Sequence, residues 1–219
     1  MKIAYSHLIH HMNEIPSIKD LSNRLFQLGH EHEIHNKIFH MEFTPNRGDC
    51  LSVNGLLRDL GAFYTIKLNQ DIYSEEIDKL SINFKNLSKE ACPQISFFKL
   101  EIEELPLLYR GSLKDYFSDL NLKPNNFFTD VSNYISYETG QPTHCYDADS
   151  MSGSLSFQEI DFNSEFETLL GKKVSLQGKN AVFLLDNKVI NLAGVMGNKD
   201  TSCSHNTKTV LVECAFFNP

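Results

Sequence analysis

The sequence lacks the features that mark membrane proteins and disulfide-rich secreted proteins. No apolar run approaches the roughly 20 residues that a membrane span needs. The N-terminus, MKIAYSHLIHHMNE, has no uninterrupted apolar core of the kind that a signal peptide carries. The five cysteines are scattered and form no C-x-x-C pair, which favours reduced thiols in a cytosol over a disulfide framework or a zinc ribbon. We therefore expect a cytoplasmic protein without a membrane partner.

An excess of positive charge is also missing, because the 219 residues carry a net charge of −8. A protein that grips a nucleic-acid backbone strongly usually has a basic face. The charge is uneven, however, since residues 171–213 hold six lysines against three acidic residues. We expect no DNA partner, and if RNA contacts the chain we expect it at this end. An ordinary solvated surface is the alternative explanation of the lysines.

The first 70 residues have the pattern of a small N-terminal helical domain. Ser17 and Asp20 approximate a capping box at the start of a helix that Gly29 ends. Residues 38–43 alternate like a strand. The histidines around this helix and strand have no H-E-x-x-H spacing, so we expect no metal site.

A turn at residues 44–49 precedes the apolar positions of a second helix. We expect Asp49 to cap that helix, because a side-chain oxygen can accept a hydrogen bond from the first turn. We also expect Asp49 and Arg47 to form a buried or partly buried ion pair with a structural role.

Residues 71–219 are expected to form a larger second domain. The polar residues 68–92, at the boundary between the two domains, are typical of a linker with one short amphipathic element. Further elements are expected as a strand at 94–104, a helical stretch from Pro106 to Asn121, β-rich structure at 154–191 with a hairpin turn at Asp186–Asn187, and a last strand at 210–215. The predicted fold class is α+β, a small N-terminal α/β domain followed by a mixed domain with mainly antiparallel sheet.

The stretch from Asp130 to Asp147, DVSNYISYETGQPTHCYD, is the most unusual in the chain. It begins like a half-buried strand or the edge of a helix. Gly140, Gln141 and Pro142 then stop regular structure, because glycine frees the backbone and proline fixes φ and removes a donor. A dense run of hydrogen-bonding side chains follows. This run is either a ligand site on a rigid turn or a buried loop whose side chains satisfy its own backbone.

Two further features could carry chemistry. Glu213 lies in the apolar run VLVECAFF, where a buried carboxylate is costly unless it is paired or hydrogen-bonded. It either sits on an exposed sheet face or points into a pocket. Gly194 and Gly197 flank a turn whose backbone N–H groups could approach a ligand. Such glycine pairs also occur in ordinary turns.

Three collinear stretches together resemble one family. They are TPNRGDCLSVNGLLRDLGA (44–62), the stretch 130–147 with its NY and GxPxH elements, and LAGVMGNKDTSCSHNTKTVLVECAFFNP (192–219). The family is the β subunit of phenylalanyl-tRNA synthetase, and the resemblance covers nearly all of this chain but only about the first third of a typical bacterial β chain. It implies a small helical domain followed by an editing domain.

The resemblance also implies roles for individual residues. The family's editing domain hydrolyses the ester of tyrosine wrongly attached to the phenylalanine tRNA, because a synthetic site for phenylalanine cannot strongly exclude an isostere with one added hydroxyl. Glu213 matches the glutamate that recognises the tyrosine phenol, and His144 matches the histidine that places water or the RNA terminus. Substrate-binding positions are implied for Gly194, Gly197, Asn133 and Thr143 as well.

The sequence departs from the family pattern in several places. Only about fifteen residues separate Gly29 from Thr44, where bacterial chains insert an oligonucleotide-binding barrel. Tyr146 stands where the family run GxPxHxFD has phenylalanine, and Asn198 replaces a glycine. A further pocket segment would lie beyond Pro219.

The resemblance implies a set of partners. They are the phenylalanine tRNA, the synthetase α subunit and the remaining β-subunit domains. ATP and magnesium are expected for the complete synthetase, with aminoacylation on the α subunit and no cofactor bound by this portion. Two alternatives stay open beside proofreading: a non-catalytic assembly module with a vestigial pocket, and a free-standing editing factor.

Overall fold

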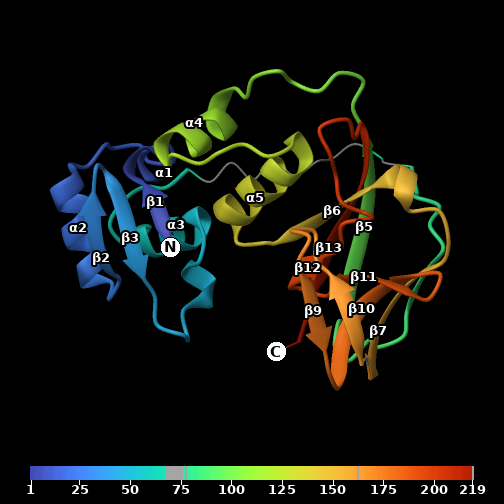
Figure 1. The fold of residues 1–219 in the computed structure, drawn as a ribbon. Coiled ribbons are helices and arrows are strands. Elements are labelled where there is room, and N and C mark those ends of the chain that lie inside the picture. Colours follow the sequence, from blue (N-terminus) through green and yellow to red (C-terminus); the bar gives the residue numbers. More distant parts are fainter. Residues whose placement is uncertain (68–75, 77, 162, 219) are drawn as a thin grey trace. The chain divides into compact units, whose positions relative to one another are not determined.

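The computed structural model describes residues 1–67, 76, 78–161 and 163–218, and these form two compact units (Figure 1). The first unit contains residues 1–76, 107–124 and 133–141, and the second contains 77–106, 125–132 and 142–219. The first unit thus takes in two segments that follow residue 70. The predicted linker, residues 68–92, falls partly outside the described residues.

The first unit is built on a three-stranded antiparallel sheet in the order β1-β3-β2. Its strands are β1 (Lys2–Ala4), β2 (Glu31–His35) and β3 (Ile38–Glu42), so the predicted strand at 38–43 is confirmed. The residues between Gly29 and Thr44 form the β2–β3 hairpin. One apolar core joins the sheet to helices α1 (Tyr5–Ile9), α2 (Ile18–Gln27) and α3 (Val53–Leu60).

Local sequence decides where these helices begin. The Ser17 side chain accepts a hydrogen bond from the backbone N–H of Asp20, as a helix N-cap should, and Gly29 after α2 has a φ of +83°. The prediction that Asp49 caps α3 is wrong. Ser52 holds that position and accepts from the N–H of Gly55, because Asp49 lies in a separate short 3-10 turn, Gly48–Cys50.

The predicted ion pair between Arg47 and Asp49 is present, with Arg47 Nε 3.0 Å from Asp49 Oδ1. Arg47 is only 31% exposed, but Asp49 is on the surface, 40% exposed. The pair therefore belongs to the rim of the unit and not to its interior.

Two more helices follow in the chain. The predicted helical stretch after Pro106 is α4 (Gly111–Asp119), and Asn121 after it has a φ of +52°. Helix α5 (Phe127–Thr139) contributes its first half to the second unit and its second half to the first. The beginning of the stretch 130–147 is therefore helix, and Gly140, with a φ of +79°, ends it as expected.

The second unit is a β-rich assembly, as the sequence predicted, and the α+β fold class with mainly antiparallel sheet is confirmed. A five-stranded sheet has the order β12-β11-β10-β7-β4, a three-stranded sheet the order β5-β13-β6, and β8 pairs with β9. Only the β4–β7 pair is parallel among the pairs of the described strands. The strands are β4 (Phe84–Asn86), β5 (Gln94–Glu101), β6 (Thr143–Asp147), β7 (Leu155–Asp161), β8 (Ser164–Glu167), β9 (Lys173–Leu176), β10 (Lys179–Leu185), β11 (Lys188–Leu192), β12 (Met196–Gly197) and β13 (Thr209–Phe216).

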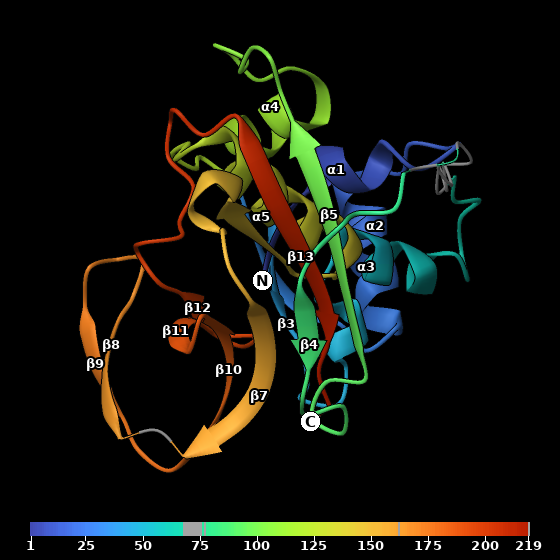
Figure 2. The same cartoon turned by 90° about the vertical axis from the view of Figure 1, so that its right-hand side faces the viewer.

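The long strands β5 and β13 run side by side, and β7 curves away from them (Figure 2). Apolar side chains of both sheets meet in one core that contains Tyr146, Phe157 and Phe183. The predicted hairpin at Asp186–Asn187 connects β10 to β11, with φ values of +45° and +69° that suit Asp and Asn in a tight turn. Every described helix is too short or too polar to cross a membrane.

Candidate functional site

Strand β6 brings two of the predicted site residues, His144 and Glu213, together. It pairs with β13 so that His144 lies directly opposite Glu213. Residues opposite each other in an antiparallel pair project to the same face, and successive residues alternate between faces. His144, Tyr146 and Glu213 therefore share the face that packs on the five-stranded sheet.

Glu213 is buried, at 4% exposure, which excludes an exposed sheet face as its position. The hydroxyl of Tyr146 donates to Glu213 Oε2 at 2.6 Å. Asn191 on β11 donates from Nδ2 to the Tyr146 hydroxyl at 2.8 Å and reaches Oε2 at 3.5 Å. All three side chains are almost fully buried, so this is a polar cluster inside an apolar core. Such a cluster persists only when its members satisfy one another.

Burial changes the protonation of both predicted catalytic residues. It raises the pKa of Glu213 to about 7, against which the Tyr146 hydrogen bond acts. Burial also lowers the pKa of His144 to about 4. At neutral pH the imidazole is therefore uncharged and able to form a hydrogen bond with water or a hydroxyl group, whereas Glu213 titrates close to neutrality.

Gly197 shapes the position of the imidazole. A Cβ atom at this residue would lie 2.5 Å from Cε1 and 2.6 Å from Nε2 of His144, closer than real contacts allow. The ring also stacks edge-on against Tyr146, with centroids 4.4 Å apart. The glycine is therefore required so that β12 can approach His144. Gly194 has a φ of +70° and faces the ring of Phe217, whose atoms lie 3.3 Å from the position of its Cβ.

The other two predicted residues do not join this cluster. Thr143 projects to the opposite face of β6, where its hydroxyl lies 2.8 Å from that of Ser132 on α5. Ser132 also donates to the carbonyl of Thr143, which anchors the strand on the helix. Asn133 is exposed on the part of α5 that belongs to the first unit.

Tyr146 and Asn191 are members of the cluster that the sequence did not predict. Tyr146 could have been found by its spacing, because residues two apart on a strand share a face. Asn191 carried no such sign, since it lies in an apolar return strand, 45 residues from its partner.

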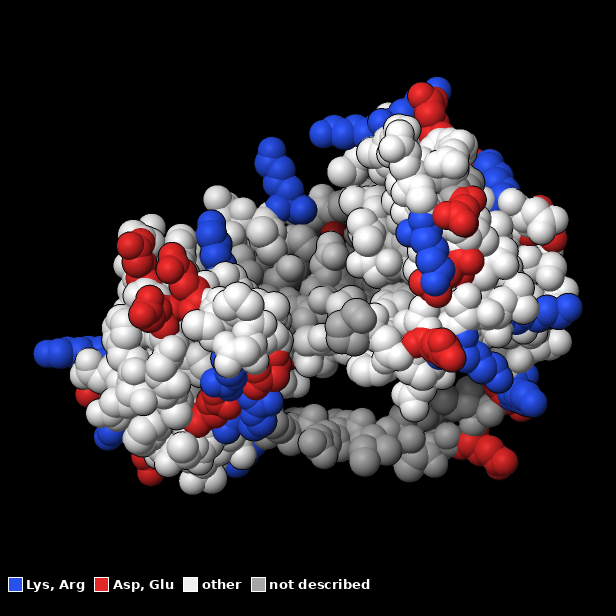
Figure 3. All heavy atoms as spheres, turned by 90° about the horizontal axis from the view of Figure 1, so that it is seen from below, with Lys and Arg blue, Asp and Glu red and all other residues white. Residues whose placement is uncertain are grey.

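The lysine-rich end forms no single basic face. Three of its lysines pair with acids: Lys173 with Glu165, Lys179 with Glu159, and Lys188 with Asp200. In the view of Figure 3, Lys and Arg side chains are scattered over the surface, and many of them lie near Asp or Glu. A hollow of about 440 Å³ at this end is lined by acids and lysines alike, Glu165 and Lys199 among them.

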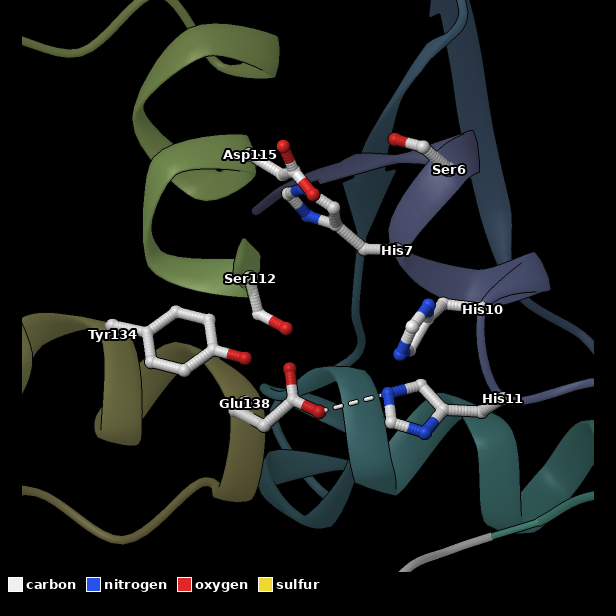
Figure 4. Close-up of a pocket in the computed structure, with 8 residues that line it drawn as sticks. All are labelled: Ser6, His7, His10, His11, Ser112, Asp115, Tyr134 and Glu138. Atoms are coloured by element: carbon white, nitrogen blue, oxygen red, sulfur yellow. Dashed lines mark ion pairs between the residues drawn. The ribbon is translucent and has the colours of Figure 1, made fainter. Parts of the chain in front are cut away.

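The first unit has a small polar cavity of about 50 Å³, room for a few water molecules (Figure 4). Histidines in and just after α1 face side chains of α4 and α5 across it; the lining is Ser6, His7, His10, His11, Ser112, Asp115, Tyr134 and Glu138. His11 Nε2 lies 2.9 Å from Glu138 Oε1, and this hydrogen bond raises the pKa of His11.

We expect Glu138→Gln to lower the pKa of His11 toward 6.5, because the main cause of its rise is the carboxylate. A raised folded-state pKa gives stability that is complete below 6.5 and is lost as pH rises through the folded value. The variant should therefore lose about 0.5–1 kcal/mol at pH 5.5 and less at pH 8. An NMR titration of the imidazole with melts at both pH values measures this.

Glu33→Gln is the matched control, because Glu33 and His35 form an exposed pair, 78% and 58% exposed. Its stability should stay within about 0.5 kcal/mol of the wild type. An unchanged pKa of His11 in Glu138→Gln would show that the ion pair does not hold in solution.

Three possible metal ligands converge elsewhere in the first unit. Atoms of His30, Cys50 and Asp59 lie within 4.8 Å of one another. The Arg47 guanidinium occupies this position, with Nη2 2.5 Å from Asp59 Oδ2 and 2.8 Å from Cys50 Sγ. Because Arg47 already supplies the positive charge and the donors, the cluster is explained as a structural network.

Comparison with known proteins identifies the family. The model of the B3/4 domain matches residues 110–219, half of the chain. Curated relatives named phenylalanine–tRNA ligase β subunit include those of Psychrobacter arcticus (30% identical over 192 residues), Fusobacterium nucleatum (31% over 194) and Rickettsia bellii (33% over 214). These alignments cover 84%, 85% and 83% of this chain and 24% of each relative.

The chain thus spans about a quarter of the length of the curated relatives it matches. A crystal structure of an N-terminal fragment of the phenylalanyl-tRNA synthetase β subunit from Pyrococcus horikoshii aligns with all of this chain and 68% of its own, at 14% identity and a TM-score of 0.49. From the domain match and the extent of the sequence similarity, the chain belongs to the B3/4 domain family and is a relative of the phenylalanine–tRNA ligase β subunits.

Proposed function

We propose that this chain serves as part of a phenylalanine–tRNA ligase β subunit in the cytoplasm and that its second unit proofreads the phenylalanine tRNA. The proposed reaction is hydrolysis of a tyrosyl ester: water adds to the ester carbonyl, the bond to the ribose oxygen breaks, and tyrosine and free tRNA leave. Aminoacylation, with ATP and magnesium, is assigned to a partner α subunit, and the remaining β-subunit domains complete the enzyme.

One observation carries this proposal: a buried carboxylate and a neutral imidazole lie side by side on the same face of adjacent strands, and the carboxylate already accepts a hydrogen bond from a phenol. The Tyr146–Glu213 bond of 2.6 Å is an intramolecular example of the contact that a tyrosyl substrate would make. A site that hydrogen-bonds a hydroxyl rejects the analogue without it, because its buried polar group is then left unpaired.

In this proposal Glu213 reads the substrate phenol, and His144 positions water or the terminal ribose. Gly197 leaves room for the imidazole, and Gly194 lines the turn beside it. The described residues form no acid–base dyad at this cluster, so the rate gain is assigned to positioning. Thr143 anchors β6, and Asn133 is assigned a contact with the RNA from its exposed place on α5.

The test is single-turnover hydrolysis of phenylalanine tRNA charged with tyrosine or with phenylalanine, by the 219-residue chain. We expect the tyrosyl ester to be hydrolysed at least about tenfold faster, the value of one well-made hydrogen bond to a charged group. Glu213→Ala should abolish the preference. Equal hydrolysis of both esters by the wild type would refute the proposal.

A non-catalytic assembly module is the second candidate. It is favoured by the closed cluster itself, in which Tyr146 and Asn191 already satisfy one oxygen of Glu213. This function predicts no saturable binding of L-tyrosinamide by calorimetry and no hydrolysis of either ester.

A further inference from the structure

We propose that Tyr146, held by Asn191, positions Glu213 so that one carboxylate oxygen is committed to the protein and the other is left for a ligand phenol. The inference rests on the proposed function, because it assigns the second oxygen to the same substrate. It makes Tyr146 a positioning residue and a determinant of specificity.

The two carboxylate oxygens of Glu213 are used unevenly. Both hydrogen bonds to Glu213, from Tyr146 and from Asn191, go to Oε2. Within the described part of the chain, no hydrogen bond reaches Oε1. An ionised carboxylate can accept about four hydrogen bonds, two on each oxygen. A side chain that is 4% exposed and keeps one oxygen without a partner has an acceptor to offer.

The partners of Glu213 Oε2 are rigid. Tyr146 is fully buried, its ring stacks against His144, and Asn191 fixes the direction of its hydroxyl from β11. Glu213 itself projects from the middle of β13, between β5 and β6. The carboxylate therefore has little freedom to rotate, and Oε1 keeps one direction relative to the imidazole.

Tyr146 also affects the protonation state of the Glu213 carboxyl group. A hydrogen bond donated to a carboxylate favours its ionised form, and the Tyr146 hydroxyl is the group that lowers the pKa of Glu213 against the effect of burial. An ionised carboxylate accepts a phenol more strongly than a neutral one does. The hydroxyl of Tyr146 thus orients the acceptor and also keeps it charged near neutral pH.

The test compares the wild type with Tyr146→Phe, which keeps the ring and removes the hydroxyl. Hydrolysis of tyrosyl and phenylalanyl esters of the phenylalanine tRNA is measured from pH 5.5 to 9. For the wild type we expect the preference for tyrosine to rise with pH around a midpoint near 7. For Tyr146→Phe we expect the preference at pH 7.5 to fall about tenfold, and its midpoint to move to higher pH.

A merely structural role for Tyr146 would lower both rates equally and leave the midpoint unchanged, and this result would overturn the proposal. An increased preference for tyrosine in Tyr146→Phe would overturn it too, because the native hydroxyl would then be a competitor of the substrate. Asn191→Ala, which frees the hydroxyl, should show the same change to a smaller extent and replaces Tyr146→Phe if that variant does not fold.

The pKa of the Glu213 carboxyl, measured by carbon NMR in both proteins, separates this proposal from the proofreading function. If the wild type prefers neither ester, proofreading fails, yet the carboxyl should still titrate at higher pH in Tyr146→Phe. If the Glu213 carboxyl has the same pKa in the wild type and in Tyr146→Phe, Tyr146 does not position the carboxylate, whichever ester is preferred.

Discussion

The effect of Glu213→Gln on the free energy of unfolding should depend on pH. At alkaline pH the substitution should be about 3 kcal/mol more favourable to the folded protein than it is at pH 4. The pKa of Glu213 is raised from 4.5 to about 7 by burial, and one pKa unit corresponds to about 1.4 kcal/mol. An acid with a raised folded-state pKa contributes stability that is complete below 4.5 and is lost as pH rises through about 7. Glutamine cannot ionise, so the variant escapes this loss.

The measurement is the free energy of unfolding of both proteins in urea at several pH values between 4 and 8.5. The difference between variant and wild type should grow through the interval from 4.5 to about 7 and then level off. Glu167→Gln is the control, because Glu167 is an exposed carboxylate on β8 whose loss should change stability by no more than about 0.5 kcal/mol. A difference for Glu213→Gln that stays flat would mean that the carboxyl is not buried in solution.

Gly197→Ala should displace the His144 ring and reduce hydrolysis of the tyrosyl ester about 100-fold. The new methyl group would lie 2.5 Å from Cε1 of the imidazole, so the ring has to leave its stack with Tyr146. A displacement of about 1 Å at a positioning group can cost a factor of this size. The overpacking should also cost about 1–3 kcal/mol of stability.

A second variant, His144→Ala, tests whether the clash with the imidazole causes the loss of stability in Gly197→Ala. Combined with Gly197→Ala, it removes the group that the methyl meets and should restore most of the lost stability without restoring hydrolysis. Gly48→Ala is the matched control, because nothing lies within 4 Å of its Cβ position. If Gly197→Ala keeps full activity and the chemical shifts of His144 stay unchanged, β12 does not contact the imidazole in solution.

Local sequence predicted those parts of the fold that depend on neighbouring residues. Ser17 caps its helix, Gly140 ends another with a φ of +79°, and the Asp186–Asn187 turn joins two strands. In each of these cases the conformation follows from one side chain or one φ value. Where two residues could serve, as with Asp49 and Ser52, the choice depended on a short 3-10 turn that the sequence does not announce.

The candidate site depends on pairings across long distances in the chain, and these were only partly predictable. A carboxylate in an apolar strand had to be paired or exposed, but nothing local indicates that Tyr146, 67 residues away, donates to it. The contact of Gly197 with His144 likewise exists only because the two sheets pack on each other. Residue types suggested the chemistry, whereas strand register decided which side chains meet.

The most direct test of the proposed site uses adenosine with tyrosine attached through an amide at the 3′ position, which hydrolysis cannot release. In NMR spectra of its complex, we expect magnetisation transfer from the phenol ring to the protons of His144 and Gly197 and a shift of the Glu213 carboxyl signal. Transfer only to residues of the hollow that includes Lys199, or only to the small polar cavity of the first unit, would show that the tyrosyl group binds elsewhere.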